Sequence, residues 1–307
     1  MKVWIIIATL NRSEELSKYT LDSLIKQNNH NFEVIVCDAS DNDLTKCIVE
    51  KTDKINITYY KAPRKGLALQ RNDSIDFIKA TAEDEDIAVF LDDDVVLSED
   101  AISGVVDTFD KYNCSGVGIP LINPNSKNQW FKNLIKIPFL NWIYATRHMT
   151  KYCHQYKPIN EKNGAKTNWL SGCGMAYRFY CFKSFSFEER LNRFGGYCLG
   201  EDALFSYLIF LEYGYLRLAN YGNLQHIKSP NSRINYENLV ASYVYNRRLM
   251  FNIINSKTAW LKLIFLKFGF FWNSIYIYFS LWFKAIKDHS YKSFKNGMKK
   301  GKIKYDE

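Results

Sequence analysis

The sequence predicts an α/β fold, in which a mixed sheet containing parallel strands is flanked by helices and followed by a C-terminal helical extension. Short apolar runs of strand length alternate with helical patterns over the first third of the chain. Several runs end in acidic or polar side chains, as strands do where an open sheet binds a ligand. A long aromatic segment and a basic tail end the chain. We therefore expect two parts, residues 1–230 and 231–307.

The first apolar run, Val3–Ala8, is continuous, which predicts a strand buried on both faces. The polar loop Thr9–Arg12 follows it. Ser13 is positioned to cap a helix that extends to about Gln27, with two glutamates in the first turn. The start of the chain is thus expected to form a strand, a loop and a helix, and its short apolar run does not predict a signal peptide.

Two further strands are expected at Phe32–Cys37, which ends in Asp38, and at Ile55–Tyr60. A loop reaches Gly66, and a helix then carries Arg71. This β-α-β order predicts parallel strands whose carboxyl ends meet at one sheet edge.

The fourth strand, residues 87–91, leads directly into Asp92, Asp93 and Asp94. Three adjacent carboxylates repel one another unless they face open water or bind a cation. Hard carboxylate oxygens suit Mg²⁺ or Mn²⁺, which also bind phosphates. A solvated acidic turn is the alternative, but the apolar strand before the acids favours a cation site.

The middle of the chain is less regular. Residues 98–112 predict a helix with Ser98 as its cap, and 116–121 predict a short strand. Residues 122–167 lack periodicity, which is consistent with a functional segment, a helical insertion or a flap. The glycines of Trp169–Gly174 either let backbone approach a ligand or form a tight turn.

Glu201 and Asp202 precede a helix expected at residues 203–213, where they are either functional acids or partners of the helix dipole. A strand is expected near 215–219. His226 is expected in the following loop, as a metal ligand or as a structural histidine.

Residues 235–254 predict a helix that carries Arg247 and Arg248, and an apolar helix follows at 258–287. Its uncharged part, residues 268–283, is shorter than the roughly 20 residues that span a membrane. We expect a helix lying in a membrane interface, with packing in a protein or dimer interface and membrane spanning as alternatives. The polar positions follow one narrow stripe: Lys262, Gly269, Asn273, Ser280, Lys284 and Lys287.

Charge is concentrated at the C-terminal end. From Lys257 onward there are eleven lysines and three acids, a net charge of +8, so the rest of the chain contributes +1 of the total +9. A nearly neutral body argues against nucleic-acid binding, and residues 257–307 predict contact with an anionic membrane through the tail Lys292–Lys304. Seven cysteines without a C-x-x-C pair indicate reduced thiols in the cytoplasm, and no zinc site. The expected location is the inner face of the cell membrane.

In their order, these motifs resemble bacterial family 2 glycosyltransferases of the GT-A fold, of the surface-polysaccharide type, over about residues 3–230. Ala8, Leu10 and Ala39 depart from the usual residues, which leaves the donor open, and the absence of a Q-x-x-R-W motif favours addition of a single sugar. The matching segments are Ala8–Arg12 for a P-T-Y-N-R-like loop, Cys37–Asp41 for D-D-x-S-x-D or similar, Gly66–Asn72 for G-x-x-x-x-R-N, Asp92–Asp94 for D-x-D, Ser171-Gly172 for a G-G or S-G loop, Glu201-Asp202 for E-D, and His226 for a later histidine.

The resemblance implies an inverting, metal-dependent hexosyltransferase. It would move one sugar from a UDP- or dTDP-sugar to a hydroxyl of a glycan or polyprenyl-diphosphate-linked acceptor, in the synthesis of a capsule or O-antigen. The implied roles are Asp92, Asp94 and His226 for Mn²⁺ or Mg²⁺; Thr9, Leu10, Asn11, Arg12, Asp38, Arg71, Asp92 and Asp93 for the donor; Trp169, Ser171 and Gly172 for the acceptor; and Asp202 as general base supported by Glu201.

Two alternatives are weaker. A sugar-1-phosphate nucleotidyltransferase carries a glycine-rich phosphate loop after its first strand, whereas Thr9–Ser13 has no glycine. A membrane-associated scaffold without activity would not need the intact acids Asp92, Asp94, Glu201 and Asp202.

Overall fold

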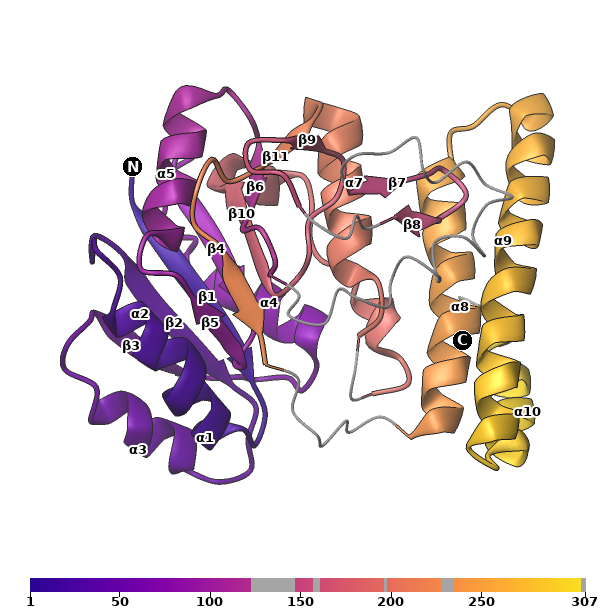
Figure 1. The fold of residues 1–307 in the computed structure, drawn as a ribbon, viewed down its shortest axis with the longest axis horizontal. Helices are drawn as coiled ribbons and strands as arrows, with labels where there is room; N and C mark the ends of the chain where they lie inside the picture. Colours follow the sequence, from indigo (N-terminus) through magenta and orange to yellow (C-terminus); the bar gives the residue numbers. More distant parts are fainter. Residues whose placement is uncertain (123–146, 157–160, 196–197, 228–234, 305–307) are drawn as a thin grey trace.

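The computed structural model describes residues 1–122, 147–156, 161–195, 198–227 and 235–304. Its centre is an eight-stranded mixed sheet, accompanied by two strand pairs (Figure 1). The eight strands are β1 (Val3–Thr9), β2 (Glu33–Asp38), β3 (Ile57–Lys61), β4 (Ile87–Leu91), β6 (Gly116–Gly118), β9 (Lys166–Thr167), β10 (Gly174–Arg178) and β11 (Leu216–Leu218), and the pairs are β5 (Val95–Leu97) with β12 (Leu224–His226) and β7 (His148–Met149) with β8 (Gln155–Tyr156).

The strand order is β3-β2-β1-β4-β10-β6-β11-β9. The first four strands are parallel, as the alternation of strands and helices predicts. β10 then runs antiparallel to both β4 and β6, so the predicted mixed sheet is confirmed. Because β1, β2 and β4 are parallel, their carboxyl ends bring Thr9, Asp38 and Asp92 to one edge.

The central strands are buried on both faces, which explains their unbroken apolar sequence. In β1, Trp4 and Ile6 belong to one apolar cluster, whereas Ile5 and Ile7 belong to another. Successive strand residues point to opposite faces, so the two clusters are the layers above and below the sheet.

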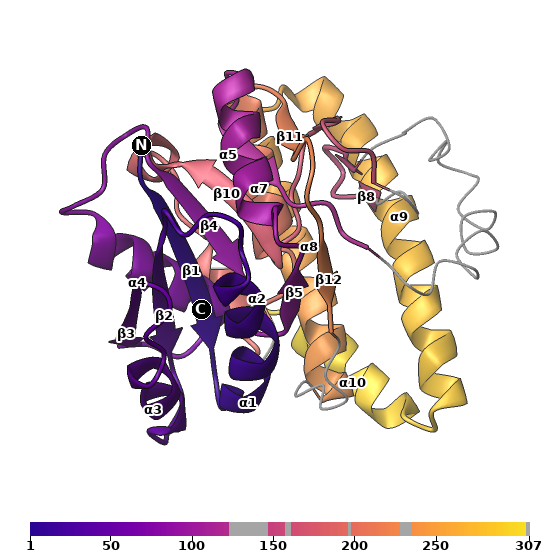
Figure 2. The same ribbon diagram turned by 60° about the vertical axis from the view of Figure 1, so that its left-hand side comes forward.

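Helices cover both faces, and α8, α9 and α10 lie together beyond α7, away from β1–β4 (Figures 1 and 2). The helical segments are α1 (Ser13–Glu15), the π-helical η1 (Leu16–Leu21), α2 (Asp22–Ile25), α3 (Leu44–Glu50), α4 (Leu67–Ile78), α5 (Ala101–Lys111), the 3₁₀ segments η5 (Phe179–Lys183) and η6 (Glu189–Asn192), α7 (Glu201–Tyr213), α8 (Tyr236–Asn255), α9 (Trp260–Lys287) and α10 (Tyr291–Lys300).

Neither serine expected to cap a helix does so. Ser13 is the first helical residue after Arg12 and makes no side-chain capping bond. Asp100, not Ser98, precedes α5, and the Ser98 hydroxyl donates a hydrogen bond of 2.6 Å to the Asp100 carboxylate. The Ser98 oxygen also accepts from the backbone N–H of Asn223, so a partner distant in sequence competes with the local cap.

His226 lies at the end of β12 rather than in a loop, which corrects the expectation. β12 pairs antiparallel with β5, and this register sets His226 opposite Val95, next to Asp94. Of the irregular segment 122–167, residues 123–146 and 157–160 lie outside the described residues. The functional-segment, insertion and flap interpretations of that part stay predictions.

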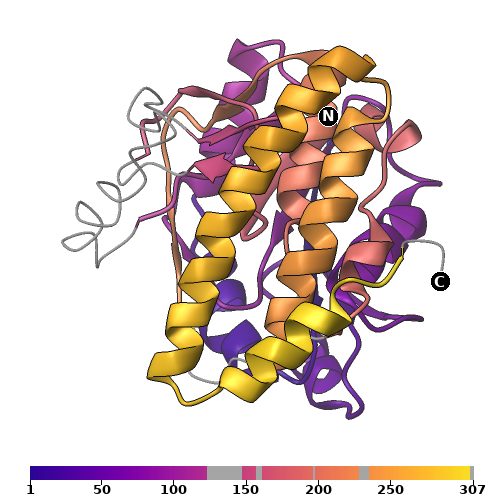
Figure 3. The same cartoon turned by 90° about the vertical axis from the view of Figure 1, so that its right-hand side faces the viewer.

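The helix α9 is the outermost of the C-terminal helices and runs beside α8 (Figure 3). Part of its polar stripe faces the protein: Asn273 is only 1% exposed, and Gly269 packs against Tyr152. Among the described residues, α9 is the one helix long and apolar enough to cross a membrane. Its other side exposes twelve large apolar side chains: Trp260, Leu261, Ile264, Phe265, Phe268, Phe271, Trp272, Ile275, Phe279, Trp282, Phe283 and Ile286.

The basic helix α10 crosses one end of α8 (Figure 3). A Cβ atom on Gly297 would lie 2.5 Å from the carbonyl oxygen of Glu237, and one on Gly301 would lie 2.6 Å from that of Ala241. These two glycines therefore let α10 contact the backbone of α8 directly.

Candidate donor, metal and acceptor site

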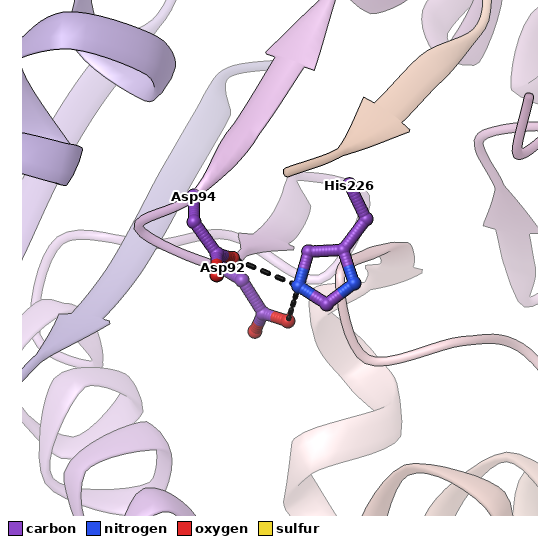
Figure 4. A group of neighbouring side chains, drawn as sticks. All are labelled: Asp92, Asp94 and His226. Atoms are coloured by element: carbon purple, nitrogen blue, oxygen red, sulfur yellow. Dashed lines mark ion pairs between the residues drawn. The ribbon is translucent and has the colours of Figure 1, made fainter. Parts of the chain in front are cut away.

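The acidic residues Asp92–Asp94 lie between the end of β4 and the start of β5, beside the end of β12. The β5–β12 register places His226 within 2.8 Å, Nε2 to Oδ1, of Asp94, and within 3.9 Å, Nε2 to Oδ2, of Asp92 (Figure 4). The candidate ligand atoms of the three residues all lie within 4.8 Å of one another. The side chains predicted as metal ligands are thus brought together.

This donor set fits a divalent cation. Two carboxylates and one imidazole around a common point suit Mg²⁺ or Mn²⁺. Burial alone would raise the pKa of Asp94, but its hydrogen bonds with His226 and Arg12 outweigh burial and hold that pKa below its usual value. Asp94 is therefore an ionised carboxylate, which is the form that binds a metal.

Asp93 faces away from this group and contacts the loop after β1. Its carboxylate accepts a 2.7 Å hydrogen bond from the Thr9 hydroxyl and lies 2.9 Å from a terminal nitrogen of Arg12. Arg12 also contacts Asp94 at 2.6 Å. Burial raises the pKa of Asp93 to about 7, although Arg12 acts in the opposite direction. Asp93 and Arg12 therefore fix the Thr9–Arg12 loop to the acidic turn.

The expected donor loop is held from a second side by the turn after β2. Asn11 adopts a left-handed backbone conformation with φ of 53°, which asparagine tolerates, and its N–H donates to the Ser40 hydroxyl at 2.6 Å. Leu10 beside it is half-buried. Asp38 is fully buried and accepts hydrogen bonds from the Ser40 N–H and the Tyr59 hydroxyl. Contact of Leu10, Asn11 and Asp38 with a nucleotide stays a prediction.

Arg71 connects the metal side to the predicted base side. Its side chain is 2% exposed, and its guanidinium lies 2.8 Å from Glu201 and 3.4 Å from Asp92. It also donates a 3.0 Å hydrogen bond to the carbonyl of Gly172. Burial opposes the charged form, but Glu201 and Asp92 hold the pKa of Arg71 above its usual value. A fixed cation thus lies between the two halves of the site.

Asp202 is oriented by backbone rather than by another acid. Its Oδ2 accepts a 2.8 Å hydrogen bond from the N–H of Gly172, and its Oδ1 accepts one of 2.7 Å from Ala203. A Cβ on Gly172 would lie 3.1 Å from Arg71 and 3.3 Å from Asp202, so only glycine fits well between them. Burial and the neighbouring Asp202 raise the pKa of Glu201 to about 8.

A cavity of about 400 Å³ adjoins Asp202. Trp169 and Ser171, which we expected near the acceptor, line it together with Glu201. Sequence patterns did not identify its far wall, where α8 and α9 contribute side chains; the paired arginines of α8 and the polar stripe of α9 were the available signals. The wall residues on these helices are Tyr243, Asn246, Arg247, Met250, Tyr276, Ile277, Ser280 and Leu281.

A mixed sheet with an acid-imidazole group at its edge, joined through one arginine to a second acidic pair, is the arrangement expected from the resemblance to glycosyltransferases of the GT-A fold. A family model agrees: Glycosyl transferase family 2 matches residues 4–185, more than half of the chain. The chain therefore belongs to glycosyl transferase family 2, and its fold class is the one that the motifs predicted. A search of curated protein sequences finds no significant match.

Solved structures share the fold at low sequence identity. A Staphylococcus aureus TarS fragment, residues 1–349 with UDP-GlcNAc, aligns with a TM-score of 0.52 and 16% identity over 81% of this chain and 66% of its own. GalNAc-T7 with UDP, GalNAc and Mn²⁺ aligns with a TM-score of 0.55 and 15% identity, over 80% of this chain and 48% of its own. A Pyrobaculum calidifontis mannosyltransferase with GDP-Man and Mn²⁺ aligns with a TM-score of 0.53 and 12% identity, over 98% of this chain and 86% of its own. The present chain thus covers just under two thirds of the TarS fragment.

Proposed function

We propose that this protein is a metal-dependent, inverting glycosyltransferase that moves one sugar from a UDP- or dTDP-sugar to a hydroxyl of a glycan or lipid-linked acceptor. The observation that carries the proposal is the link through Arg71, which contacts Asp92 on one side and Glu201 and Gly172 on the other. Gly172 in turn holds Asp202. One rigid assembly thus includes a cation site and a candidate base.

The chemistry follows from these positions. The acceptor hydroxyl attacks the anomeric carbon, its proton passes to Asp202, and the bond from that carbon to the diphosphate oxygen breaks. A divalent cation at Asp92, Asp94 and His226 would act as a Lewis acid on the departing diphosphate. Arg71 adds a fixed positive charge nearby. A single in-line displacement inverts the anomeric configuration.

The C-terminal helices support work at a membrane surface. The exposed aromatic face of α9 and the lysines of α10 together offer apolar contact and positive charge, as interfacial helices do. We propose that residues 257–307 bind the inner, anionic face of the cell membrane and that the acceptor is a sugar on a polyprenyl diphosphate, in the synthesis of a surface polysaccharide. In this proposal residues 1–230 are the catalytic domain and 231–307 are its membrane-associating extension.

Calorimetric titration with UDP, dTDP and GDP, each with and without Mn²⁺, tests the nucleotide class. The similar structures contain UDP-GlcNAc, UDP or GDP-Man, so uracil and guanine nucleotides both belong in the titration. We expect binding of UDP or dTDP that requires Mn²⁺. Absence of metal-dependent binding for every nucleotide would instead favour the inactive scaffold.

A further inference from the structure

The cavity next to Asp202 is lined by a buried cation, Arg247, that has no acidic partner among the described residues. The chain buries three arginines among its described residues. Arg71 pairs with Glu201, and Arg147 pairs with Glu161. Arg247, whose side chain is also buried, forms no ion pair there; its guanidinium lies 5.3 Å from the ring centre of Phe270 and near Cys153, Tyr243 and Tyr278. Arg247 therefore differs from the other two buried arginines, and it lies in the wall of the cavity.

The segments that the structure does not describe offer few partners for this charge. Their sequences contain only two acids, Asp306 and Glu307, at the end of the chain. Burial without a carboxylate lowers the pKa of the Arg247 guanidinium. A buried, unpaired charge is unfavourable for folding, so its presence indicates a role that folding alone does not explain.

The geometry leaves one edge of the guanidinium unused. One terminal nitrogen of Arg247 donates to the carbonyl of Cys153 at 2.7 Å, and the other donates to the side-chain oxygen of Asn273 at 2.9 Å. The Nε–H has no hydrogen-bond partner among the described residues, although it is buried. These neutral acceptors orient the guanidinium without neutralising it, so an oxyanion can still bind it.

The position of α9 indicates where the anion comes from. Tyr276, Ile277, Ser280 and Leu281 of α9 line the cavity, and the opposite side of the same helix exposes its aromatic face. A ligand that combines an apolar chain with a charged group would thus have apolar surface on one side of α9 and a cation on the other.

We propose that Arg247 recognises a phosphate or diphosphate group of the acceptor within this cavity, while the acceptor sugar reaches Asp202. The inference rests on the proposed function, because it assigns the cavity to the acceptor of that transfer. It adds the place where the acceptor's phosphate binds: the cavity wall formed by α8 and α9, with Arg247 as the cation.

Farnesyl diphosphate is a suitable probe, because it joins a diphosphate to a short apolar chain. Its binding to the full-length protein is measured in EDTA, so that the cation site does not contribute. Farnesol, which lacks the anion, and inorganic diphosphate, which lacks the chain, are the ligand controls. We expect farnesyl diphosphate to bind at least about tenfold more tightly than either. Equal affinity for inorganic diphosphate would overturn the lipid source, and equal affinity for farnesol would overturn anion recognition.

The variants then locate the site. Arg247→Gln should weaken farnesyl diphosphate binding at least about tenfold, and Arg247→Lys should weaken it less. Arg248→Gln is the matched control, because Arg248 contacts Gly301, just after α10. This variant should bind farnesyl diphosphate within about twofold of the wild-type affinity. Unchanged affinity in Arg247→Gln would refute the proposal.

Two further measurements keep the test decisive. Ser280→Trp fills the cavity from α9 without changing the hydrogen bonds of Arg247, so it should also block the probe if Arg247→Gln does not fold; normal binding in Ser280→Trp would count against the cavity. Affinity for UDP with Mn²⁺ is measured in each variant and should not change. If the wild-type protein does not bind UDP with Mn²⁺, the proposed function fails. If it binds UDP but not farnesyl diphosphate, only the role of Arg247 fails.

Discussion

The candidate donor edge and the cavity beside Asp202 present different charges to a ligand. At the donor edge, Asp92 and Asp94 converge on His226, and the nearby Arg12 and Arg71 are already engaged by carboxylates. In the cavity wall, the hydrogen bonds of Arg247 go to the neutral oxygens of Cys153 and Asn273. The sheet edge is therefore suited to a cation and the cavity wall at Arg247 to an anion. The two sites lie on opposite sides of the candidate base, Asp202.

The strongest way to break the donor side is Asp94→Ala. Loss of this ionised ligand should remove metal-dependent UDP binding and reduce turnover at least about 10³-fold, because a bound metal supplies several kcal/mol of charge stabilisation. Turnover is followed as release of nucleoside diphosphate. Asp110→Ala, which removes an exposed carboxylate from α5, should stay near wild type. Full activity in Asp94→Ala would show that this cluster is not the metal site.

Between the two regions, Asp202→Asn should separate binding from chemistry. The amide cannot take the acceptor proton, so kcat should fall at least about 10²-fold, in line with the contribution of a positioned base. Affinity for UDP with Mn²⁺ should not change, since the contacts of Asp202 are to Gly172 and Ala203. NMR of the wild-type product should show an inverted anomeric centre; retention would rule out this role for Asp202.

On the acceptor side, the aromatic face of α9 can be tested without removing the helix. Phe265→Asp with Phe279→Asp should weaken binding to anionic vesicles at least about tenfold, because both rings are more than 60% exposed and burying such a side chain contributes about 1.5–3 kcal/mol. Leu44→Asp is the control, since Leu44 is an equally exposed apolar residue on α3. Unchanged vesicle binding with an altered oligomeric state would identify a protein interface instead.

Glu201, which borders both regions, affects how stability depends on pH. Burial raises its folded-state pKa from 4.5 to about 8, so over this pH range the folded protein keeps a proton that the unfolded chain has lost. Stability should therefore fall as pH rises from about 4.5 to about 8 and change little from this cause above that.

In Glu201→Gln this contribution is absent. The thermal midpoint of the variant, measured in EDTA, should gain on that of the wild type as pH rises, by about 2–4 °C for each kcal/mol. A constant difference between the two midpoints across the range would contradict the assignment.

The donor side was largely predictable from sequence because its residues follow apolar strands. The run Ile87–Leu91 predicted β4 to the residue, and parallel strands necessarily bring Thr9, Asp38 and Asp92 to one edge. The β5–β12 pair was not predicted, because each strand has three residues and gains its stability from a partner more than 100 positions away.

The acceptor side was mostly not predictable. Helical periodicity places Asn273 and Ser280 on one stripe of α9, but it does not say which side of a helix meets the protein. The structure turns part of that stripe, around Asn273, toward Arg247 and the cavity. Similarly, the sequence does not distinguish Arg247 from Arg248, whereas in the structure Arg247 is buried and Arg248 contacts Gly301.

The close contact of α10 with α8 has a mechanical consequence. Because Gly297 and Gly301 rest on the backbone of α8, the lysines of α10 lie in direct contact with the helix that carries Arg247. If α9 and α10 lie on a bilayer, the height and tilt of the whole enzyme above the lipid headgroups are then fixed by these two glycines. Bulkier residues there would change how far the cavity stands from the surface, and so the reach that an acceptor needs.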